Sequence, residues 1–154
     1  MNDPKSNLEK LLRPSDPAQY SPLALAYLGD AVYEILVRQQ VVEEGNRQVE
    51  KMHRETIRFV NAGAQAARRL RIEPFLTDAE RAIYKRGRNA TGHTMPKNQS
   101  MSDYRKATGF EALLGWLYLK GDVDRIRELL AAGDAERMPA DETVPENPEE
   151  NEGE

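Results

Sequence analysis

The sequence predicts an all-α protein with one helical domain. Three observations lead to this fold class. Apolar stretches of helix length alternate with capping residues, no segment shows the alternating pattern of a strand, and 154 residues fit a single domain. No repeat with a period of 20–50 residues is visible, which argues against a solenoid.

The first long helix is expected over 23–42. Ser21 is a favourable N-cap and Pro22 is favoured at the first helical position, while Gly45 follows as a stop. A second helix is expected after Asn46, and Thr77 with Glu80 forms a capping box for a third. The expected helices after the first cover 46–71, 77–87, 103–119 and 123–132.

The ends of the chain differ from this central part. Residues 1–20 are polar and contain three prolines, so we expect an arm with one helical turn near Leu8–Leu12. Residues 133–154 are rich in Glu, Pro and Asn and are expected to form a disordered acidic tail. We therefore expect the domain to span 21–132.

Composition excludes several classes of protein. The chain has no cysteine and only two histidines, which excludes disulfide scaffolds, thiol nucleophiles and Cys- or His-rich metal cages. No apolar run reaches the length of a membrane span. The first ten residues lack the apolar centre of a signal peptide, so we expect a cytoplasmic protein without a membrane partner.

The net charge of −4 hides a strong segregation of charge. Residues 134–154 contain nine acids and one base, whereas 81–106 contain seven bases and one acid. The basic stretch predicts a local field that attracts a polyanion.

Two acids lie within apolar helical segments, Asp30 in the first long helix and Glu111 in the fourth. Glu34 follows Asp30 by one turn on the same helix face. The neighbours of the two acids are small and would let helix backbones approach closely: Gly29, Ala31, Gly109 and Ala112.

A buried carboxylate is costly unless a cation, a hydrogen bond or a proton compensates it. If Asp30 and Glu111 converge, they form a hard oxygen site suited to magnesium or manganese, and a metal beside a basic surface suggests attack on a phosphodiester. The structural alternative is that both acids pair with core Arg or Lys, or lie at helix edges. For Glu34 the simpler interpretation is a solvent-exposed helix residue rather than a metal ligand.

Two groups of cations are candidates for phosphate contact. Lys85, Arg86 and Arg88 end the third helix, and Lys97 lies in the following loop; the alternative is that they complement the helix dipole. The second group lies near His53 on the second helix, and its alternative is an exposed polar face: Lys51, Arg54 and Arg58. His93 is expected to be a solvated loop residue.

The two acidic segments resemble a known family. Tyr27-Leu-Gly-Asp-Ala-Val resembles the signature helix of the ribonuclease III catalytic domain, and Phe110-Glu-Ala-Leu-Leu-Gly-Trp-Leu-Tyr-Leu resembles its second acidic motif. The stretch 53–66 fits the same pattern. The greatest similarity is to the mini-ribonuclease III subfamily, through residues 26–34, the Arg-Gly-Arg-Asn-Ala stretch and the lack of a double-stranded-RNA-binding module.

The resemblance implies a compact helical endonuclease domain that cuts double-stranded RNA as a homodimer. It implies Asp30 and Glu111 as catalytic metal ligands for Mg²⁺ or Mn²⁺, and Tyr27 as a dimer contact that fills a socket of the partner. Cleavage would leave 5′-phosphate and 3′-hydroxyl ends. The family substrate is the paired stem of the large-subunit (23S) ribosomal RNA precursor, cut with the help of a large-subunit ribosomal protein.

Ribonuclease III proper has further acids where this chain has Ala26 and Thr108. A reduced acid set leaves each metal with more water. It also keeps open two other functions: a non-catalytic double-stranded-RNA-binding or ribosome-assembly protein with the same fold, and a helical protein–protein adaptor.

Overall fold

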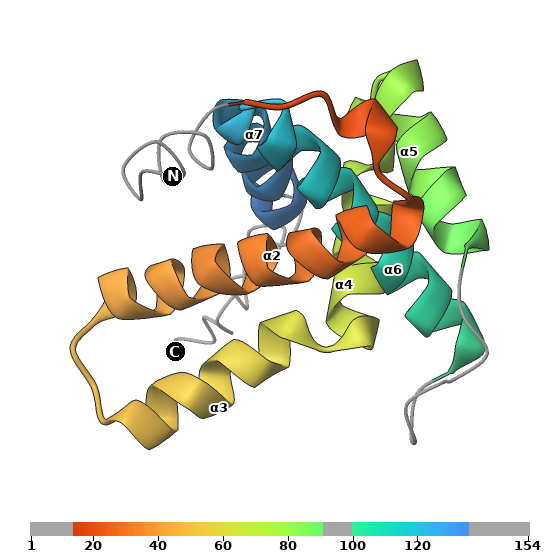
Figure 1. Ribbon diagram of the computed structural model, residues 1–154. Coiled ribbons are helices and arrows are strands. Elements are labelled where there is room, and N and C mark those ends of the chain that lie inside the picture. The colour runs from red at the N-terminus through yellow and green to blue at the C-terminus, as the bar shows by residue number, and fades with distance from the viewer. Residues whose placement is uncertain (1–13, 91–99, 136–154) are drawn as a thin grey trace, which may run out of the picture.

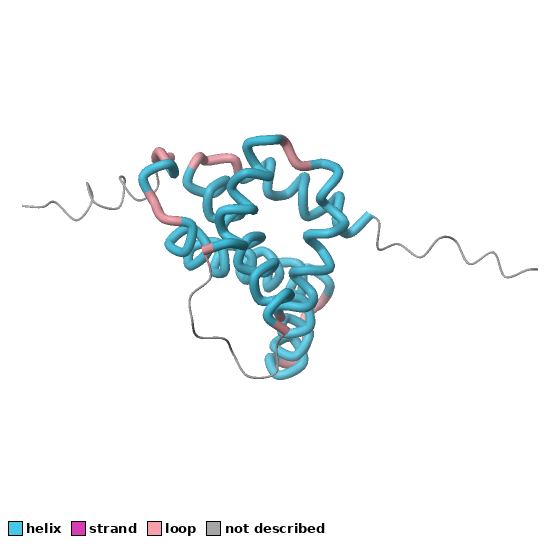
Figure 2. Tube along the Cα trace, turned by 90° about the vertical axis from the view of Figure 1, so that its right-hand side faces the viewer, coloured by secondary structure: helices cyan, strands magenta, loops and turns pink. Residues whose placement is uncertain are grey.

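The computed structural model describes residues 14–90 and 100–135, and this part of the chain contains helices and no strand (Figures 1 and 2). The all-α prediction is confirmed. The elements are two 3₁₀ turns, η1 (Pro17–Gln19) and η2 (Glu73–Phe75), and the helices α2 (Pro22–Glu44), α3 (Val49–Val60), α4 (Ala62–Ile72), α5 (Asp78–Asn89), α6 (Met101–Leu119) and α7 (Val123–Ala135). Within residues 14–90 and 100–135, none of the helices combines the length and the apolar character of a membrane span.

Helix α6 forms the centre of the core. It contacts α2, α4, α5 and α7, and Phe110, Leu113 and Leu114 on it have no exposed surface. Its apolar residues therefore continue all round the helix rather than along one stripe, as expected of a helix surrounded by others. Figure 1 shows α6 passing behind α2, with α5 and α7 at either side.

Two glycines bring α5 against α6. A Cβ atom on Gly109 would lie 2.7 Å from the backbone oxygen of Tyr84, and one on Gly87 would lie 2.6 Å from the Cβ of Ala112. Both residues were expected to let helix backbones approach closely. The structure places Gly109 against α5, whereas Ala112 meets α5 at Gly87 and also forms a core cluster with Leu25 and Ala26 of α2.

The expected helix over 46–71 is two helices that meet at Asn61. The extended backbone of Asn61 ends α3, and its Oδ1 accepts a hydrogen bond from Ala64 N at 2.9 Å to cap α4. Its Nδ2 also donates to the carbonyls of Ile57 and Arg58 at the end of α3. Helix α3 begins at Val49, after Gln48 rather than Asn46.

Other helix ends follow their predicted signals closely. Ser21 caps α2, Gly45 ends it, and Thr77 with Glu80 forms the capping box of α5. Helix α7 continues to Ala135, so its last turn includes residues that were assigned to the tail. The turn expected at Leu8–Leu12 and residues 136–154 lie outside the described residues.

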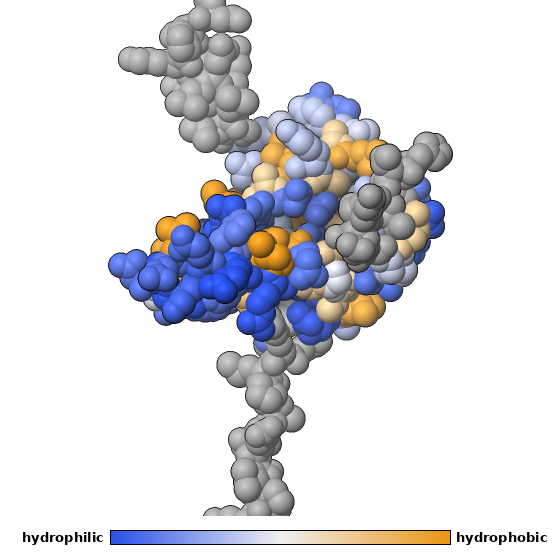
Figure 3. All heavy atoms as spheres, turned by 90° about the horizontal axis from the view of Figure 1, so that it is seen from below, coloured by the Kyte–Doolittle hydropathy of each residue, from blue (hydrophilic) through white to orange (hydrophobic). Residues whose placement is uncertain are grey.

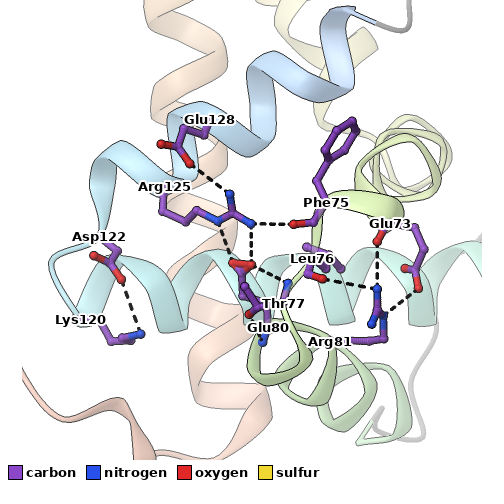
Figure 4. A network of polar contacts seen from close by, with 10 residues as sticks. All are labelled: Glu73, Phe75, Leu76, Thr77, Glu80, Arg81, Lys120, Asp122, Arg125 and Glu128. Atoms are coloured by element: carbon purple, nitrogen blue, oxygen red, sulfur yellow. Dashed lines mark hydrogen bonds and ion pairs between the residues drawn. The ribbon is translucent and has the colours of Figure 1, made fainter.

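A polar network fixes α7 to the start of α5 (Figure 4). The buried carboxylate of Glu80 accepts hydrogen bonds from Arg125 at 2.8 and 3.0 Å and from the backbone of Thr77 at 3.0 Å. Burial alone would raise the pKa of Glu80, but the hydrogen bonds from Arg125 and Thr77 outweigh it and lower that pKa. Arg125 also donates to the carbonyl of Phe75 in η2.

Candidate functional site

The site lies where α2 crosses α6 at very close range. A Cβ atom on Gly29 would lie 1.7 Å from the backbone oxygen of Glu111, and one on Gly115 would lie 2.0 Å from the backbone oxygen of Leu25. Only glycine fits at either position. Because Asp30 follows Gly29 directly, this crossing brings the two predicted acids together from segments far apart in the sequence.

The electrostatics of the two carboxyls show that they interact. Burial, with the charge of Asp30 as the second cause, raises the pKa of Glu111 to about 7, although a hydrogen bond from Gln65 opposes the rise. The pKa of Asp30 is raised by partial burial of its carboxyl and then by the charge of Glu34, even though the residue as a whole is exposed. Each acid thus lacks enough compensation for its charge.

The structural alternative had two forms, and pairing with core cations is wrong for the described part of the chain, whereas Asp30 does lie at an exposed helix edge. Between 14–90 and 100–135 no ion pair involves Asp30 or Glu111. The arginine buried in the core, Arg68, pairs with Asp134 instead. Glu34 is bound by Arg38 at 2.7 Å one turn along α2, as expected for a residue on the helix surface.

Gln65 on α4 is a site residue that the sequence analysis missed. It is 2% exposed, and its Nε2 donates to Glu111 Oε1 at 3.0 Å and to the carbonyl of Val60 at 2.9 Å. Its sequence signals were a long polar side chain among small residues and its place in the stretch 53–66, which fits the family pattern. From the sequence such a residue would be predicted to be exposed, and only the position of α6 shows that it is buried.

The donor chemistry suits a hard divalent cation. Residues 14–90 and 100–135 contain no cluster of three or more His, Asp or Glu side chains placed to hold a metal ion. Magnesium does not require such a cage, because it keeps several waters and is commonly bound by one or two carboxylates with substrate phosphates. Asp30 and Glu111 fit that requirement, and their mutual repulsion is what a cation would relieve.

The predicted cations around α5 take different positions. Lys85 and Arg86 are exposed, whereas Arg88 is half-buried with its guanidinium 5.9 Å from the centre of the Tyr84 ring. Lys97 and His93 lie outside the described residues. Arg88 lines a hollow of about 300 Å³ between α5 and α6, whose other lining residues include two cations not assigned before: Arg105 and Lys106.

The second group of cations lies on α3. Lys51, Arg54 and Arg58 are all exposed, and the surface over α3 is strongly hydrophilic when seen from below (Figure 3). His53 is also exposed, and it lines a separate hollow between α2 and α3 together with Arg38. Among the described residues, neither group of cations forms an ion pair with Asp30 or Glu111.

Tyr27 is 86% exposed on α2, which is unusual for a large aromatic side chain. The same helix lines a hollow of about 280 Å³ with mostly apolar walls, formed by Leu28, Ala31, Val32, Ile35, Leu36, Tyr118, Val123 and Ile126. An exposed aromatic beside an apolar hollow is the kind of surface that a protein interface covers.

Comparison with known proteins gives a consistent result. Residues 23–122 match the model of the ribonuclease III domain. The mini-ribonuclease 3 of Symbiobacterium thermophilum is 46% identical over 121 residues, covering 79% of this chain and 93% of that protein. The mini-ribonuclease 3 of a Thermoanaerobacter species is 44% identical over 121 residues, covering 79% and 85%.

The fold comparison agrees with the sequence comparison. The crystal structure of a protein from Fusobacterium nucleatum matches with a TM-score of 0.71 and 27% identity, covering 80% of this chain and 99% of that one. The sequence matches and the helical architecture thus agree. The chain belongs to the ribonuclease III family, with mini-ribonuclease 3 proteins among its relatives.

Proposed function

We propose that the protein cuts double-stranded RNA with the aid of a divalent metal ion held by Asp30 and Glu111. As a member of the ribonuclease III family it is an endoribonuclease. The observation that supports the catalytic site is the convergence, at the crossing of α2 and α6, of two carboxyls that have no ion-pair partner among the described residues. Mg²⁺ or Mn²⁺, once bound, would supply a Lewis acid and a water of lowered pKa next to the scissile phosphate.

The chain's own residues have three roles in this proposal. Asp30 and Glu111 hold the ion through their carboxylate oxygens, and the glycines at the helix crossing fix the distance between the two helices. The exposed cations of α5 and α3 bind RNA phosphates without reading base sequence. A-form RNA is recognised mainly by its shape and its backbone, so such contacts are sufficient.

We propose that the protein acts as a homodimer, with each subunit cutting one strand. The exposed Tyr27 and the apolar hollow along α2 support this, because a two-fold interface uses the same patch on both subunits. In this arrangement Tyr27 of one subunit would be covered by the other.

The family resemblance extends the proposal to the substrate. We infer that the paired termini of the 23S ribosomal RNA precursor are cut in the cytoplasm, assisted by a large-subunit ribosomal protein, leaving 5′-phosphate and 3′-hydroxyl ends. The role in ribosomal RNA maturation rests on the resemblance alone.

The test is cleavage of a labelled RNA duplex with Mg²⁺ or with EDTA, and the control is the same strand without its complement. Cleavage of the duplex in Mg²⁺ alone supports the proposal. Salt-sensitive binding without cleavage would instead indicate the non-catalytic RNA-binding function. Neither binding nor cleavage would indicate a helical adaptor.

A further inference from the structure

Gln65 is held in one orientation by contacts at both of its amide hydrogens. Its Nε2 donates to the carbonyl of Val60, at the end of α3, and to Oε1 of Glu111 on α6. The Val60 carbonyl can only accept, so the amide nitrogen must face it and the amide oxygen cannot exchange places with that nitrogen. The side chain is also enclosed, with 2% of the residue exposed.

The contact to Val60 makes this orientation independent of the site. Asn61 ends α3 and caps α4 just after Val60, so the turn that presents the Val60 carbonyl also sets the start of the helix that carries Gln65. The backbone therefore holds one hydrogen of the amide in place, and the other hydrogen remains directed at the carboxylate of Glu111.

The oxygen of the same amide has no partner. Among residues 14–90 and 100–135, no donor lies within hydrogen-bonding distance of the buried Oε1 of Gln65. Buried polar atoms in native proteins are nearly always hydrogen-bonded to protein or to ordered water. We therefore expect a donor, such as a water molecule, to bond to this oxygen. The oxygen is attached to the same carbon as the nitrogen that contacts Glu111, which places it near the Glu111 carboxylate.

We propose that Gln65 is a positioning residue of the metal site: its amide nitrogen orients the Glu111 carboxylate, and its amide oxygen accepts a hydrogen bond from a water of that site. The inference rests on the metal-binding function proposed above. Partners that orient metal ligands commonly change metal affinity by about 10–100-fold when they are removed.

The first test compares Mn²⁺ binding, measured by electron paramagnetic resonance on the full chain without RNA, in the wild type and in Gln65→Met. Methionine keeps the length of the side chain but donates and accepts no strong hydrogen bond. The matched control is Thr56→Val, because Thr56 is also buried but, within the described residues, its hydroxyl bonds only to Met52 of its own helix. We expect roughly tenfold weaker Mn²⁺ binding in Gln65→Met and unchanged binding in Thr56→Val.

Cleavage separates positioning from a general loss of structure. The Mg²⁺ concentration that gives half-maximal cleavage should rise about tenfold in Gln65→Met, while the rate at saturating Mg²⁺ recovers most of the wild-type value. A folded Gln65→Met variant that binds Mn²⁺ as the wild type does would overturn the inference. Failure of the wild type itself to bind Mn²⁺ would instead overturn the proposed function.

A measurement on the unmodified protein covers the case in which Gln65→Met does not fold. The side-chain amide resonance of Gln65 should shift when Mg²⁺ is added, because the carboxylate that it contacts changes its partner. Gln39 is the internal control, since it donates to the exposed carboxylate of Glu43 at 2.9 Å, away from the site. A Gln65 resonance that moves no more than that of Gln39 would also overturn the inference.

Discussion

Gly29 lies so close to the backbone of Glu111 that a Cβ atom on it would be 1.7 Å from the Glu111 carbonyl oxygen. The obstacle is backbone in a central helix, which cannot move aside as a side chain can. The distance between the two proposed metal ligands is therefore set by the absence of a single methyl group.

Gly29→Ala is expected to separate α2 from α6 and to lower the free energy of unfolding by about 3 kcal/mol or more. Cleavage of duplex RNA should fall with it. The control is Gly63→Ala in α4, where the nearest atom to an added Cβ is Asn61 Oδ1 at 3.4 Å and alanine favours the helix. Thermal unfolding of both variants checks this, and equal melting temperatures would contradict the account of the crossing.

Asp30→Asn and Glu111→Gln are expected to lower the rate of duplex RNA cleavage by orders of magnitude. Each substitution removes a charge and keeps the volume, so the crossing of α2 and α6 should persist. Glu43→Gln is the matched control, because Glu43 is an exposed acid of the same helix whose charge does not act on Asp30 or Glu111. Cleavage assays in Mg²⁺, with binding followed separately by gel shift, check this. An amide variant with near wild-type rate would contradict the assignment of metal ligands.

Stability without metal should fall as pH rises from about 4.5 through about 7. In that window the folded protein keeps a proton on Glu111, whose pKa is raised to about 7. The unfolded chain has lost this proton above the ordinary glutamate pKa of 4.5. The folded state therefore binds more protons, and raising the pH favours unfolding. Glu111→Gln should remove this dependence and be more stable than the wild type at about pH 8, by on the order of 2 kcal/mol.

Denaturant unfolding at several pH values, with EDTA and then with Mg²⁺, checks this prediction. Mg²⁺ should stabilise the wild type above pH 7 and should have no such effect on Glu111→Gln, because the ion competes with the proton for the same carboxylate. Parallel pH profiles for the two proteins would show that Glu111 titrates normally.

Replacing Arg86 and Arg88 by Ala should weaken RNA binding and flatten its dependence on salt by about one to two units in the log–log slope. Each phosphate contact that is lost no longer releases counterions. The comparison is a triple Ala variant of the α3 group, Lys51, Arg54 and Arg58, which are all exposed. If the α5 variant loses stability with an unchanged salt slope, those arginines only complete their helix and the phosphate contacts lie elsewhere.

Tyr27→Ala is expected to weaken the homodimer and, with it, the cleavage of both strands. One substitution removes two contacts, because a two-fold interface uses each patch twice. Tyr20→Ala is the control, since Tyr20 is also an exposed aromatic but lies before α2 rather than on it. Light scattering at micromolar concentration measures the mass, and a monomeric wild type would contradict the proposal.

Local signals in the sequence were sufficient for most helix ends. Caps such as Ser21 and Thr77 satisfy backbone groups through nearby residues, so their effect does not depend on the rest of the fold. The break at Asn61 was missed because the flanking residues suit a helix on both sides, and one side chain both ends α3 and caps α4.

The candidate site required information that no single helix contains. The pair of acids was identified because carboxylates are unusual in apolar segments, but Gln65 is polar in a segment that gave no reason to expect burial. Its role depends on α6 crossing near α4, which is a property of the tertiary packing. Likewise Gly109 and Gly115 look alike in sequence, and only the packing shows that the first faces α5 and the second faces α2.

The carboxylate of Glu80 serves two parts of the fold at once. It accepts from the backbone of Thr77 at the start of α5 and from the guanidinium of Arg125 on α7, as Figure 4 shows. Opening either contact leaves a buried charge with fewer partners, so the two helices should open as one cooperative unit. Amide hydrogens in the second turns of α5 and α7, which are bonded within their helices, should thus exchange with deuterium at matching opening free energies, although 45 residues separate Glu80 from Arg125 in the chain.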